Sequence, residues 1–275
     1  MVVMMDILII NLERSVDRRI FQQEQFKKIG LPVQFLAAVT TDDISDTQFE
    51  AEAFGWERPL KRVELACFLS HKKAWRYVQE SNKPALIIED DAVVVKDLAL
   101  ILSELENSTV NFSPDLVNLE VRSRKKIVGQ QPIYQITSTN YDVLELFQER
   151  TGTGGYVLYP SGARKLLEKA KKNAAATADA FIFSTYELNA FQVEPAALIQ
   201  EDQMVAYGLA DKEKFESTIG RSEHFKPVYK SLAEKRKFRQ RRWLGQWNMA
   251  CRYLQVMFKS EKRFIRLDQS KFQQD

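Results

Sequence analysis

The sequence ALIIEDD at residues 85–91 places four apolar residues directly before three adjacent carboxylates. Pro84 precedes it, and the apolar part predicts a buried β-strand that ends at the acids. Because side chains alternate along a strand, we expect Glu89 and Asp91 to point to one side.

Three adjacent carboxylates repel one another unless a cation or hydrogen-bond donors compensate their charge. Mg²⁺ and Mn²⁺ prefer carboxylate, phosphate and water oxygens, so a divalent cation that carries a diphosphate suits this strand end. We predict Asp91 as the direct metal ligand and Glu89 as the second. Two alternatives stay open: a solvated acidic loop or helix N-terminus, and a phospho-acceptor domain or phosphatase. A phospho-acceptor domain is shorter than this chain and would leave most of it unused.

The segments around this strand alternate between the two types of secondary structure. Strands are predicted at residues 7–12, 31–39, 116–121, 133–137, 156–159 and 191–199. Helices are predicted at residues 17–28, 63–80, 97–105 and 161–171, the last capped by Ser161. Residues 40–50 are polar and predict a loop, and residues 180–189 fit either type. The alternation indicates a layered α/β fold, in which ligands bind beyond the carboxyl ends of the strands.

Composition limits the class of protein. The chain has 275 residues, of which 45% are hydrophobic, enough for a sizeable core. It contains no apolar run of the ~20 residues that span a bilayer. Residues 2–10 predict a buried first strand and not a secretory signal. Cys67 and Cys251 are the only cysteines, and we expect two reduced thiols in the cytosol.

The charge is distributed unevenly. Residues 226–266 carry 13 Lys and Arg against two Glu, an excess of 11, so the rest of a chain with net charge +3 is near −8. We therefore predict a main domain at residues 1–222 and a basic helical segment at 223–275. Basic residues interleaved with aromatic ones suit an anionic membrane surface. Nucleic acid is the electrostatic alternative, although we predict no nucleic-acid partner, and a solvated helical cap is the third interpretation.

Four segments, taken together, point to one family. They are residues 9–19 (IINLERSVDRR), 64–75 (ELACFLSHKKAW), 85–92 (ALIIEDDA) and 152–156 (GTGGY) with 161–167 (SGARKLL). In this order they resemble the motifs of glycosyltransferase family 25, the lipopolysaccharide and lipooligosaccharide galactosyltransferases. The resemblance covers roughly residues 6–222. One such segment could arise by chance, but four in register are specific.

The resemblance implies a GT-A-like nucleotide-sugar-binding fold with a mixed, mostly parallel central sheet. It also implies a UDP-sugar donor, usually UDP-galactose, and inversion at the anomeric carbon. Donor-binding residues carried over from the motifs are Asn11, Leu12, Arg14, Arg18, Ser70, His71 and Asp90. For the first four the alternative is a capped surface helix with its own ion pairs, and for Ser70 and His71 it is a structural role.

An inverting transfer needs one general base that can reach the acceptor hydroxyl. Asp179 is our first candidate, because it matches the family's Asp before a Phe, although an Asp there can also cap a helix. Glu120, at a predicted strand end, is the second, and Glu201 is a third. Gly154, Gly155 and Tyr156 are assigned to the acceptor side, where glycine lets backbone approach closely. Asp202 and His224 are candidates for a further metal ligand.

These inferences converge on one predicted activity. The chain is expected to transfer galactose, with inversion, from UDP-galactose to a core sugar of a lipid-linked oligosaccharide, on the cytoplasmic face of the inner membrane. The alternatives are a UDP-glucose donor, a phosphoryl-transfer enzyme, and a non-catalytic protein that binds nucleotide sugar or membrane on the same scaffold.

Overall fold

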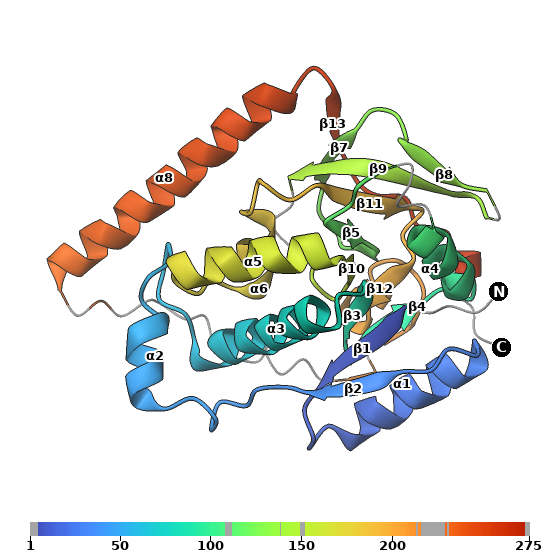
Figure 1. The fold of residues 1–275 in the computed structure, drawn as a ribbon, viewed down its shortest axis with the longest axis horizontal. Coiled ribbons are helices and arrows are strands. Elements are labelled where there is room, and N and C mark those ends of the chain that lie inside the picture. The colour runs from blue at the N-terminus through green and yellow to red at the C-terminus, as the bar shows by residue number, and fades with distance from the viewer. Residues whose placement is uncertain are drawn as a thin grey trace.

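The computed structural model describes residues 5–107, 112–137, 139–148, 152–212, 214–215, 229 and 231–272. His224, Lys226 and Lys230, which the sequence suggested for the metal site and the basic segment, lie outside these residues. Figure 1 shows two groups of helices around a large twisted sheet, with one long helix set apart from both. The helices are α1 (Val16–Lys28), α2 (Asp46–Glu52), α3 (Arg62–Ser81), α4 (Leu98–Asn107), α5 (Pro160–Lys172), α6 (Ala178–Phe183), α7 (Glu201–Met204) and α8 (Leu232–Val256).

The strands form two sheets. The large sheet has the order β13-β7-β9-β11-β5-β10-β3-β1-β2, with β8 paired to β9, and the small one has the order β4-β12-β6. Their bounds are β1 (Asp6–Asn11), β2 (Gln34–Ala37), β3 (Ala85–Glu89), β4 (Ala92–Val94), β5 (Leu116–Asn118), β6 (Glu120–Val121), β7 (Lys126–Gly129), β8 (Tyr134–Ile136), β9 (Tyr141–Gln148), β10 (Gly155–Leu158), β11 (Ala190–Glu194), β12 (Leu198–Gln200) and β13 (Ser260–Arg263).

The large sheet is mixed, as expected, but the prediction that it is mostly parallel is wrong. Only the pairs β1–β2, β1–β3 and β5–β11 run parallel in it, and the other described pairs are antiparallel. Two of the antiparallel pairs, β7–β9 and β8–β9, follow from residues 126–148, where β7, β8 and β9 follow one another without a helix. A parallel return needs a crossover of a dozen or more residues, so connections this short give antiparallel neighbours.

The side chains of β1 pack against helices on both faces of the sheet. Ile7 and Ile9 point into one apolar cluster, which includes Phe26 of α1 and the buried face of α4. Leu8 and Ile10 point into the other cluster, with residues of α3, α5 and α6. An apolar run that is buried on both faces is typical of strands in the centre of an α/β sheet. The sheet therefore has helices on both sides, and its strand ends are left for a site.

Several local predictions need correction. Residues 46–52 form helix α2 in place of a loop, because the Ser45 hydroxyl accepts from the Gln48 N–H at 3.1 Å and caps it. Residues 116–121 form two strands, β5 and β6, which belong to different sheets. Ser161 is not the cap of α5, since that helix begins at Pro160, a residue well suited to a first helical position.

The C-terminal part of the chain is only partly helical. After α8 the chain returns to the large sheet, where β13 pairs with β7. Ile265 and Phe272 then enter the same apolar cluster as β1, with exposed fractions of 3% and 5%. Within the described residues, none of the helices combines the length and the apolar character needed to cross a membrane.

Candidate active site at the acidic strand end

Asp90 contacts a different set of residues from its two acidic neighbours. Its Oδ2 accepts from the Asn11 side chain at 2.8 Å, and its Oδ1 accepts from Arg18 at 2.8 Å. Burial raises the pKa of Asp90, and the contacts with Arg18 and Asn11 oppose that rise. The structure thus joins Asn11, Arg18 and Asp90, three of the predicted donor-binding residues, in one buried group at the ends of β1 and β3.

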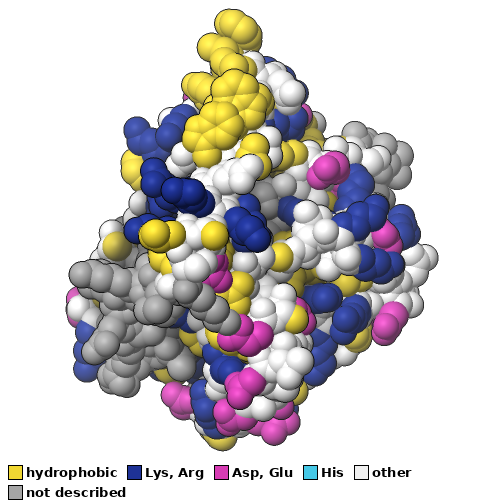
Figure 2. Space-filling view, turned by 90° about the vertical axis from the view of Figure 1, so that its left-hand side faces the viewer, with side chains coloured by type: hydrophobic (Ala, Val, Ile, Leu, Met, Phe, Trp, Pro, Cys, Tyr) yellow, Lys and Arg dark blue, Asp and Glu magenta, His cyan; other side chains and the backbone are white. Residues whose placement is uncertain are grey.

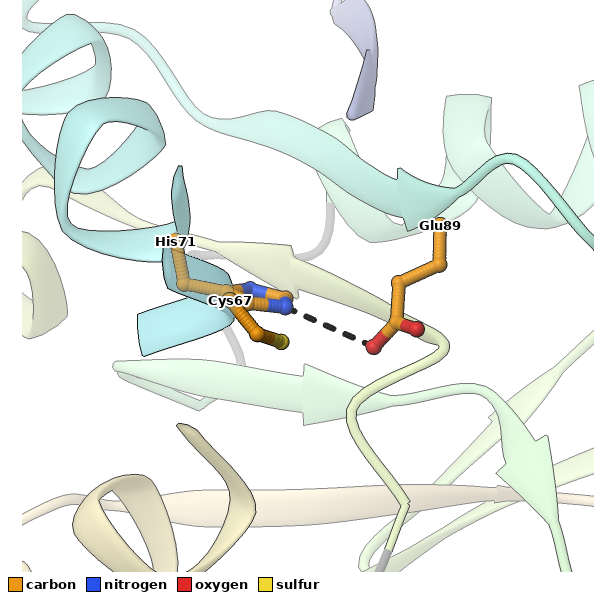
Figure 3. Close-up of side chains that lie close together, drawn as sticks. All are labelled: Cys67, His71 and Glu89. Atoms are coloured by element: carbon orange, nitrogen blue, oxygen red, sulfur yellow. Dashed lines mark ion pairs between the residues drawn. The ribbon is translucent and has the colours of Figure 1, made fainter. Parts of the chain in front are cut away.

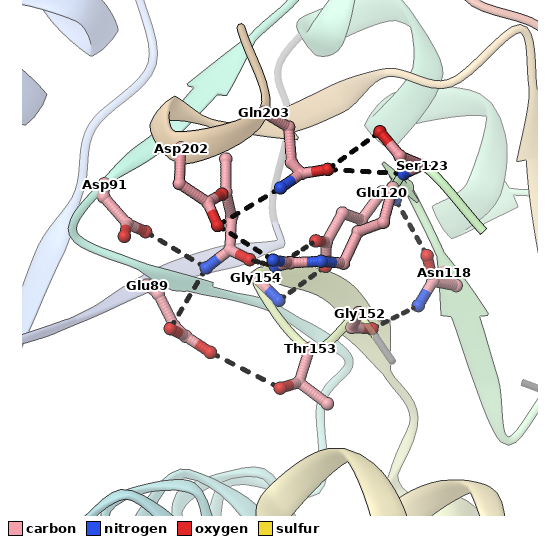
Figure 4. Close-up of polar contacts among 12 residues, drawn as sticks. Glu89, Asp91, Asn118, Glu120, Ser123, Gly152, Thr153, Gly154, Asp202 and Gln203 are labelled. Carbon is pink, nitrogen blue, oxygen red and sulfur yellow. Dashed lines mark hydrogen bonds and ion pairs between the residues drawn. The ribbon is translucent and has the colours of Figure 1, made fainter. Parts of the chain in front are cut away.

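Glu89 and Asp91 face the other way and share one donor. The Nε2 of Gln200 donates to a carboxylate oxygen of each, at 3.2 Å in both cases (Figure 4). This agrees with the alternation expected from the sequence. Burial, followed by the charge of Glu89, raises the pKa of Asp91 to about 7. Glu89 and Asp91 thus lie on either side of one amide group. A cation bound there would stabilise both carboxylates in their ionised form.

A chain of buried side chains approaches Glu89 from α3. The indole Nε1–H of Trp75 donates to the Tyr156 hydroxyl at 2.9 Å, and that hydroxyl lies 2.9 Å from Nδ1 of His71. With one hydrogen bond accepted from Trp75, the Tyr156 hydroxyl has its own hydrogen to donate to Nδ1, which assigns the ring hydrogen to Nε2. Nε2 lies 3.4 Å from Oε1 of Glu89 and points at it (Figure 3). Burial raises the pKa of Glu89, but His71 and Arg122 outweigh it, so the pKa is lowered.

Cys67 lies one helical turn before His71 on the same face of α3. Its sulfur, a His71 nitrogen and a Glu89 oxygen lie within 4.8 Å of one another, a group that could hold a metal ion. Burial, followed by the charge of Glu89, raises the pKa of the Cys67 thiol well above its usual range. A protonated thiol and an imidazole N–H are both donors, so this trio suits a cation less well than Glu89 and Asp91 do.

Glu120 closes the site from β6. It is completely buried, and its carboxylate accepts from the Gly154 N–H at 2.7 Å, with Arg122 at 3.4 Å. Burial raises the pKa of Glu120 to about 7, against the opposing charges of Arg122 and Lys126. Because the Glu120 carboxylate is buried and accepts from a backbone N–H, it exposes no oxygen atom to an acceptor sugar.

Arg122 and Gln200 are site residues that the sequence analysis missed. Arg122 pairs with Asp202 at 2.9 Å, hydrogen-bonds Gln200 and contacts Glu120. The feature that could have identified both residues is their position at a strand end, since Arg122 directly follows β6 and Gln200 ends β12. The two short strands were not recognised as neighbours, so the sequence did not bring the residues together. Asp202, considered as a metal ligand, contacts Arg122 through Oδ2.

The glycine segment packs directly against β12. A Cβ on Gly154 would lie 2.5 Å from Cγ of Gln200, and one on Gly155 would lie 2.1 Å from Cδ1 of Leu198. The glycines therefore make room for side chains of the small sheet. Thr153, in the same segment, donates to Glu89 at 3.4 Å, a contact that the sequence did not suggest.

Asp179 lies in the first turn of α6, where Thr177 occupies the N-cap position. Its Oδ1 accepts from the Ala180 N–H at 2.8 Å. Burial raises its pKa, and the charge of Glu89 adds to that rise while Arg122 opposes it. Asp179 is only half-buried, and it lies within electrostatic reach of the acidic strand end.

The remaining predicted residues have other surroundings. Ser70 donates to the Ala66 carbonyl at 2.8 Å and accepts from the Val39 N–H at 2.9 Å, so its hydroxyl joins α3 to the loop after β2. The Leu12 carbonyl accepts from the Ser15 N–H at 2.8 Å in the turn before α1, and Arg14 is exposed there. Glu201 is buried, and its N–H donates to the Asp91 carbonyl at 3.0 Å.

Comparisons with known proteins identify relatives. The family described as "Glycosyltransferase family 25 (LPS biosynthesis protein)" matches residues 4–182. The lacto-N-neotetraose biosynthesis glycosyltransferase LgtE of Neisseria meningitidis serogroup B is 27% identical over 206 residues, covering 70% of this chain and 73% of the relative. LgtB of the same organism, named likewise, is 25% identical over 58% of this chain and 60% of its own length. Procollagen galactosyltransferase 1-B of Xenopus laevis is 26% identical over 70% of this chain and 35% of its own length.

Proposed function

The chain belongs to glycosyltransferase family 25, and from this membership and its acidic strand end we propose that it is an inverting galactosyltransferase. The donor is UDP-galactose, and the acceptor is a sugar of a lipid-linked lipooligosaccharide or lipopolysaccharide core. The names of the similar proteins, which include a lacto-N-neotetraose biosynthesis enzyme and a procollagen galactosyltransferase, support this choice of sugar and acceptor. The observation that carries the proposal is the pair Glu89 and Asp91, which share the amide of Gln200.

That pair fits a divalent cation, Mn²⁺ or Mg²⁺. Both are hard ions that take carboxylate oxygens. Burial, followed by the charge of Glu89, raises the pKa of Asp91, and a bound cation would favour its ionised form. When bound, the ion supplies charge neutralisation for the departing diphosphate. Asp91 is proposed as the first ligand and Glu89 as the second. His71, through Nε2–H, holds Glu89 in its carboxylate form.

Arg18 and Arg122 are the cations proposed to face the donor phosphates. Arg18 lies 3.7 Å from Asp91 as well as 2.8 Å from Asp90, and its side chain is 13% exposed. Arg122 approaches from β6, and its side chain is 24% exposed. Guanidinium groups suit phosphate oxygens because their donors form a planar fork. Asn11, Leu12, Arg14 and Ser70 shape the same end of β1 and α3 and complete the proposed donor side.

Asp179 is proposed as the general base that takes the proton from the acceptor hydroxyl. It is partly exposed, whereas Glu120 is completely buried and accepts the Gly154 N–H. The base must approach the acceptor oxygen to hydrogen-bond distance, which favours the partly exposed carboxyl of Asp179 over the buried one of Glu120. Glu120 then has the role of fixing the segment of Gly154, Gly155 and Tyr156, proposed to border the acceptor.

The test is release of UDP by the purified chain from UDP-galactose and, in parallel, from UDP-glucose, each with and without a lipooligosaccharide acceptor. We expect acceptor-dependent release from UDP-galactose that a chelator abolishes and Mn²⁺ restores. The variants Asp91→Asn and Asp179→Asn should each lose at least about a hundredfold in rate. Asp42→Asn, at an exposed carboxylate on the loop before α2, is the matched control. Full activity of Asp91→Asn in the presence of chelator would reject the metal role.

A further inference from the structure

Helix α8 attaches to the rest of the molecule along one side only. Phe238 and Val256 are both 2% exposed and stand 18 positions apart, which is about five helical turns. Arg241, on the same side, donates to the Phe54 carbonyl at 2.8 Å. Between them Gly245 lies so close to Glu57 that a Cβ would meet its Oε1 at 2.0 Å. This side of α8 is the packing side.

A second apolar row runs along the opposite side of the same helix. Trp243 stands five positions after Phe238, which places it about 140° around the axis. The row repeats at spacings of 11, 4, 7 and 4 residues, all close to whole turns, and its last member lies two residues past the end of α8. Its members have exposed fractions of 57% or more, namely 77% for Leu232, 61% for Trp243, 57% for Trp247, 63% for Leu254 and 88% for Phe258. We call these five residues the outward row.

The outward row has features that a solvated helix does not need. The rings of Trp243 and Trp247 stack with centroids 5.9 Å apart and 11° between their planes. Single exposed apolar residues are ordinary, but two stacked tryptophans on the same side of one helix as three other large exposed apolar side chains are not. Figure 2, which faces the side of the molecule where α8 lies in Figure 1, shows hydrophobic side chains gathered at one end with Lys and Arg beside them.

The charge of α8 indicates what meets the outward row. The helix carries Glu234 as its one acid and seven basic residues, which are Lys235, Arg236, Lys237, Arg239, Arg241, Arg242 and Arg252. A second copy of the chain would bring two such helices together and set like charges against each other. Nucleic acid would satisfy the charges, but it would leave the aliphatic members of the row in water. An anionic lipid surface satisfies both, because headgroups take the basic residues while the apolar row enters the acyl boundary.

We propose that α8 is a membrane-docking helix, which lies in the plane of an anionic bilayer with the outward row inserted below the headgroups. The proposal rests on the proposed function in one respect, which is that the acceptor reached by the docked enzyme is a lipid-linked sugar at that surface. The packing side of α8 is tied to the loop before α3, through Arg241, and to β9, where Gln148 donates to the Met249 carbonyl at 2.8 Å. Docking through α8 therefore fixes the orientation of the whole molecule on the membrane.

The experiment is cosedimentation of the full chain with two kinds of vesicle, phosphatidylcholine alone and phosphatidylcholine with one third phosphatidylglycerol. We expect binding to the anionic vesicles that weakens in high salt, and much weaker binding to the neutral ones. The double variant Trp243→Ser/Trp247→Ser should reduce the partition coefficient at least about tenfold. Arg239→Glu/Arg242→Glu should reduce it by a similar factor on anionic vesicles only. The matched control is Leu100→Ser/Ile133→Ser, at two apolar residues that are each 42% exposed and lie elsewhere, which should bind normally.

The outcomes separate this proposal from its alternatives. If the first variant fails to fold, Leu254→Ser/Phe258→Ser tests the same row. The proposal is overturned if the chain stays in the supernatant with anionic vesicles at low salt, or if both row variants bind as well as the parent. It is also overturned if the row instead mediates a dimer or binding to a single-stranded oligonucleotide without any vesicle binding. Transfer from UDP-galactose to a delipidated acceptor needs no membrane, so its retention in the row variants distinguishes failed docking from a failed proposed function.

Discussion

At the scale of single residues, the site depends on how three neighbouring carboxylates are compensated. Asp90 has Asn11 and Arg18 within 2.8 Å. Glu89 has the Nε2 of His71 beside it, which helps to hold its pKa down. Among the described residues, Asp91 has the shared amide at 3.2 Å and Arg18 at 3.7 Å, and burial followed by the charge of Glu89 raises its pKa to about 7. The three acids are therefore not equivalent, and Asp91 is the one whose ionised form a cation would stabilise most.

This inequality predicts how Mn²⁺ binding responds to pH. A ligand carboxylate must lose its proton before it coordinates, so protons compete with the metal below the pKa of Asp91. We expect the apparent Kd for Mn²⁺ to rise about tenfold for each pH unit below 7 and to level off above it. Calorimetry between pH 5.5 and 8.5 measures this, with Asp42→Asn as the control. A Kd that is flat across this range would contradict the assignment of Asp91 as ligand.

The raised pKa of Glu120 predicts that the metal-free protein becomes less stable as the pH rises, whereas Mn²⁺ binding becomes stronger. Its pKa rises from an ordinary 4.5 to about 7 because of burial, so the folded state holds the proton more tightly than the unfolded state. The stabilisation is complete below pH 4.5 and is lost as the pH rises through 7. Glu120→Gln keeps the shape and should remove about 1–3 kcal/mol of this pH dependence. Chemical unfolding at pH 5 and pH 8 measures the free energy of unfolding of the parent and of the variant. If that free energy changes by the same amount between the two pH values in both proteins, the prediction is contradicted.

The sequence predicted part of this site and missed part of it for a physical reason. The alternation along residues 85–91 correctly placed Glu89 and Asp91 on one side, because they stand two positions apart, one at the end of β3 and one in the turn that follows it. Gln200 ends a strand of three residues and Arg122 follows a strand of two, and both strands are too short for a periodic signal. Their approach to Glu89 depends on the register of β12 with β6 and β4, which no local pattern contains.

At the scale of the elements, long and strongly periodic segments were predicted well and short ones were not. Helix α3, predicted at 63–80, spans Arg62–Ser81, and β3, predicted at 85–89, has those bounds. The strand β9 was missed, although its eight residues pair with three others. Charged residues at positions 142 and 145 interrupt its apolar pattern, and both lie at the surface of the sheet.

The contact between the glycine segment and β12 predicts a specific loss of stability. A Cβ on Gly155 would lie 2.1 Å from Cδ1 of Leu198, a completely buried side chain whose packed neighbours leave it little room to move. We expect Gly155→Ala to cost about 1–3 kcal/mol and to lower the melting temperature by several degrees. Adding Leu198→Val to Gly155→Ala should recover part of the loss, because the shorter side chain makes room. Additive losses in the double variant would show that the clash is not the cause.

At the scale of the whole molecule, the end of the chain completes the sheet. Residues 258–272 add β13 to β7 and place Ile265 and Phe272 in the core. They also bring Arg263 to Glu194 in β11, with a guanidinium nitrogen 2.7 Å from Oε2. Glu194 is 1% exposed, and its Oε1 accepts from the Arg266 N–H at 2.7 Å. The first strands and the last residues of the chain therefore belong to one packed unit.

This arrangement predicts that the chain cannot lose its last segment without a large cost. A truncation after residue 257 keeps α8 but leaves the Glu194 carboxylate buried without its cation, and it opens the core at Ile265 and Phe272. Arg263→Ala alone should cost about 1–3 kcal/mol, because Glu194 loses its closest cation but keeps Arg266, whose Nε lies 3.4 Å from its Oε2. The truncation removes both arginines and should cost more. Arg263→Ala/Glu194→Gln should regain stability relative to Arg263→Ala, because it removes a buried charge that has lost its closest partner. Urea unfolding compares these chains, with Lys262→Ala, at an exposed neighbour in β13, as the control. A truncated chain that unfolds at the same urea concentration as the parent would mean that residues 258–272 are an appendage and not a part of the fold.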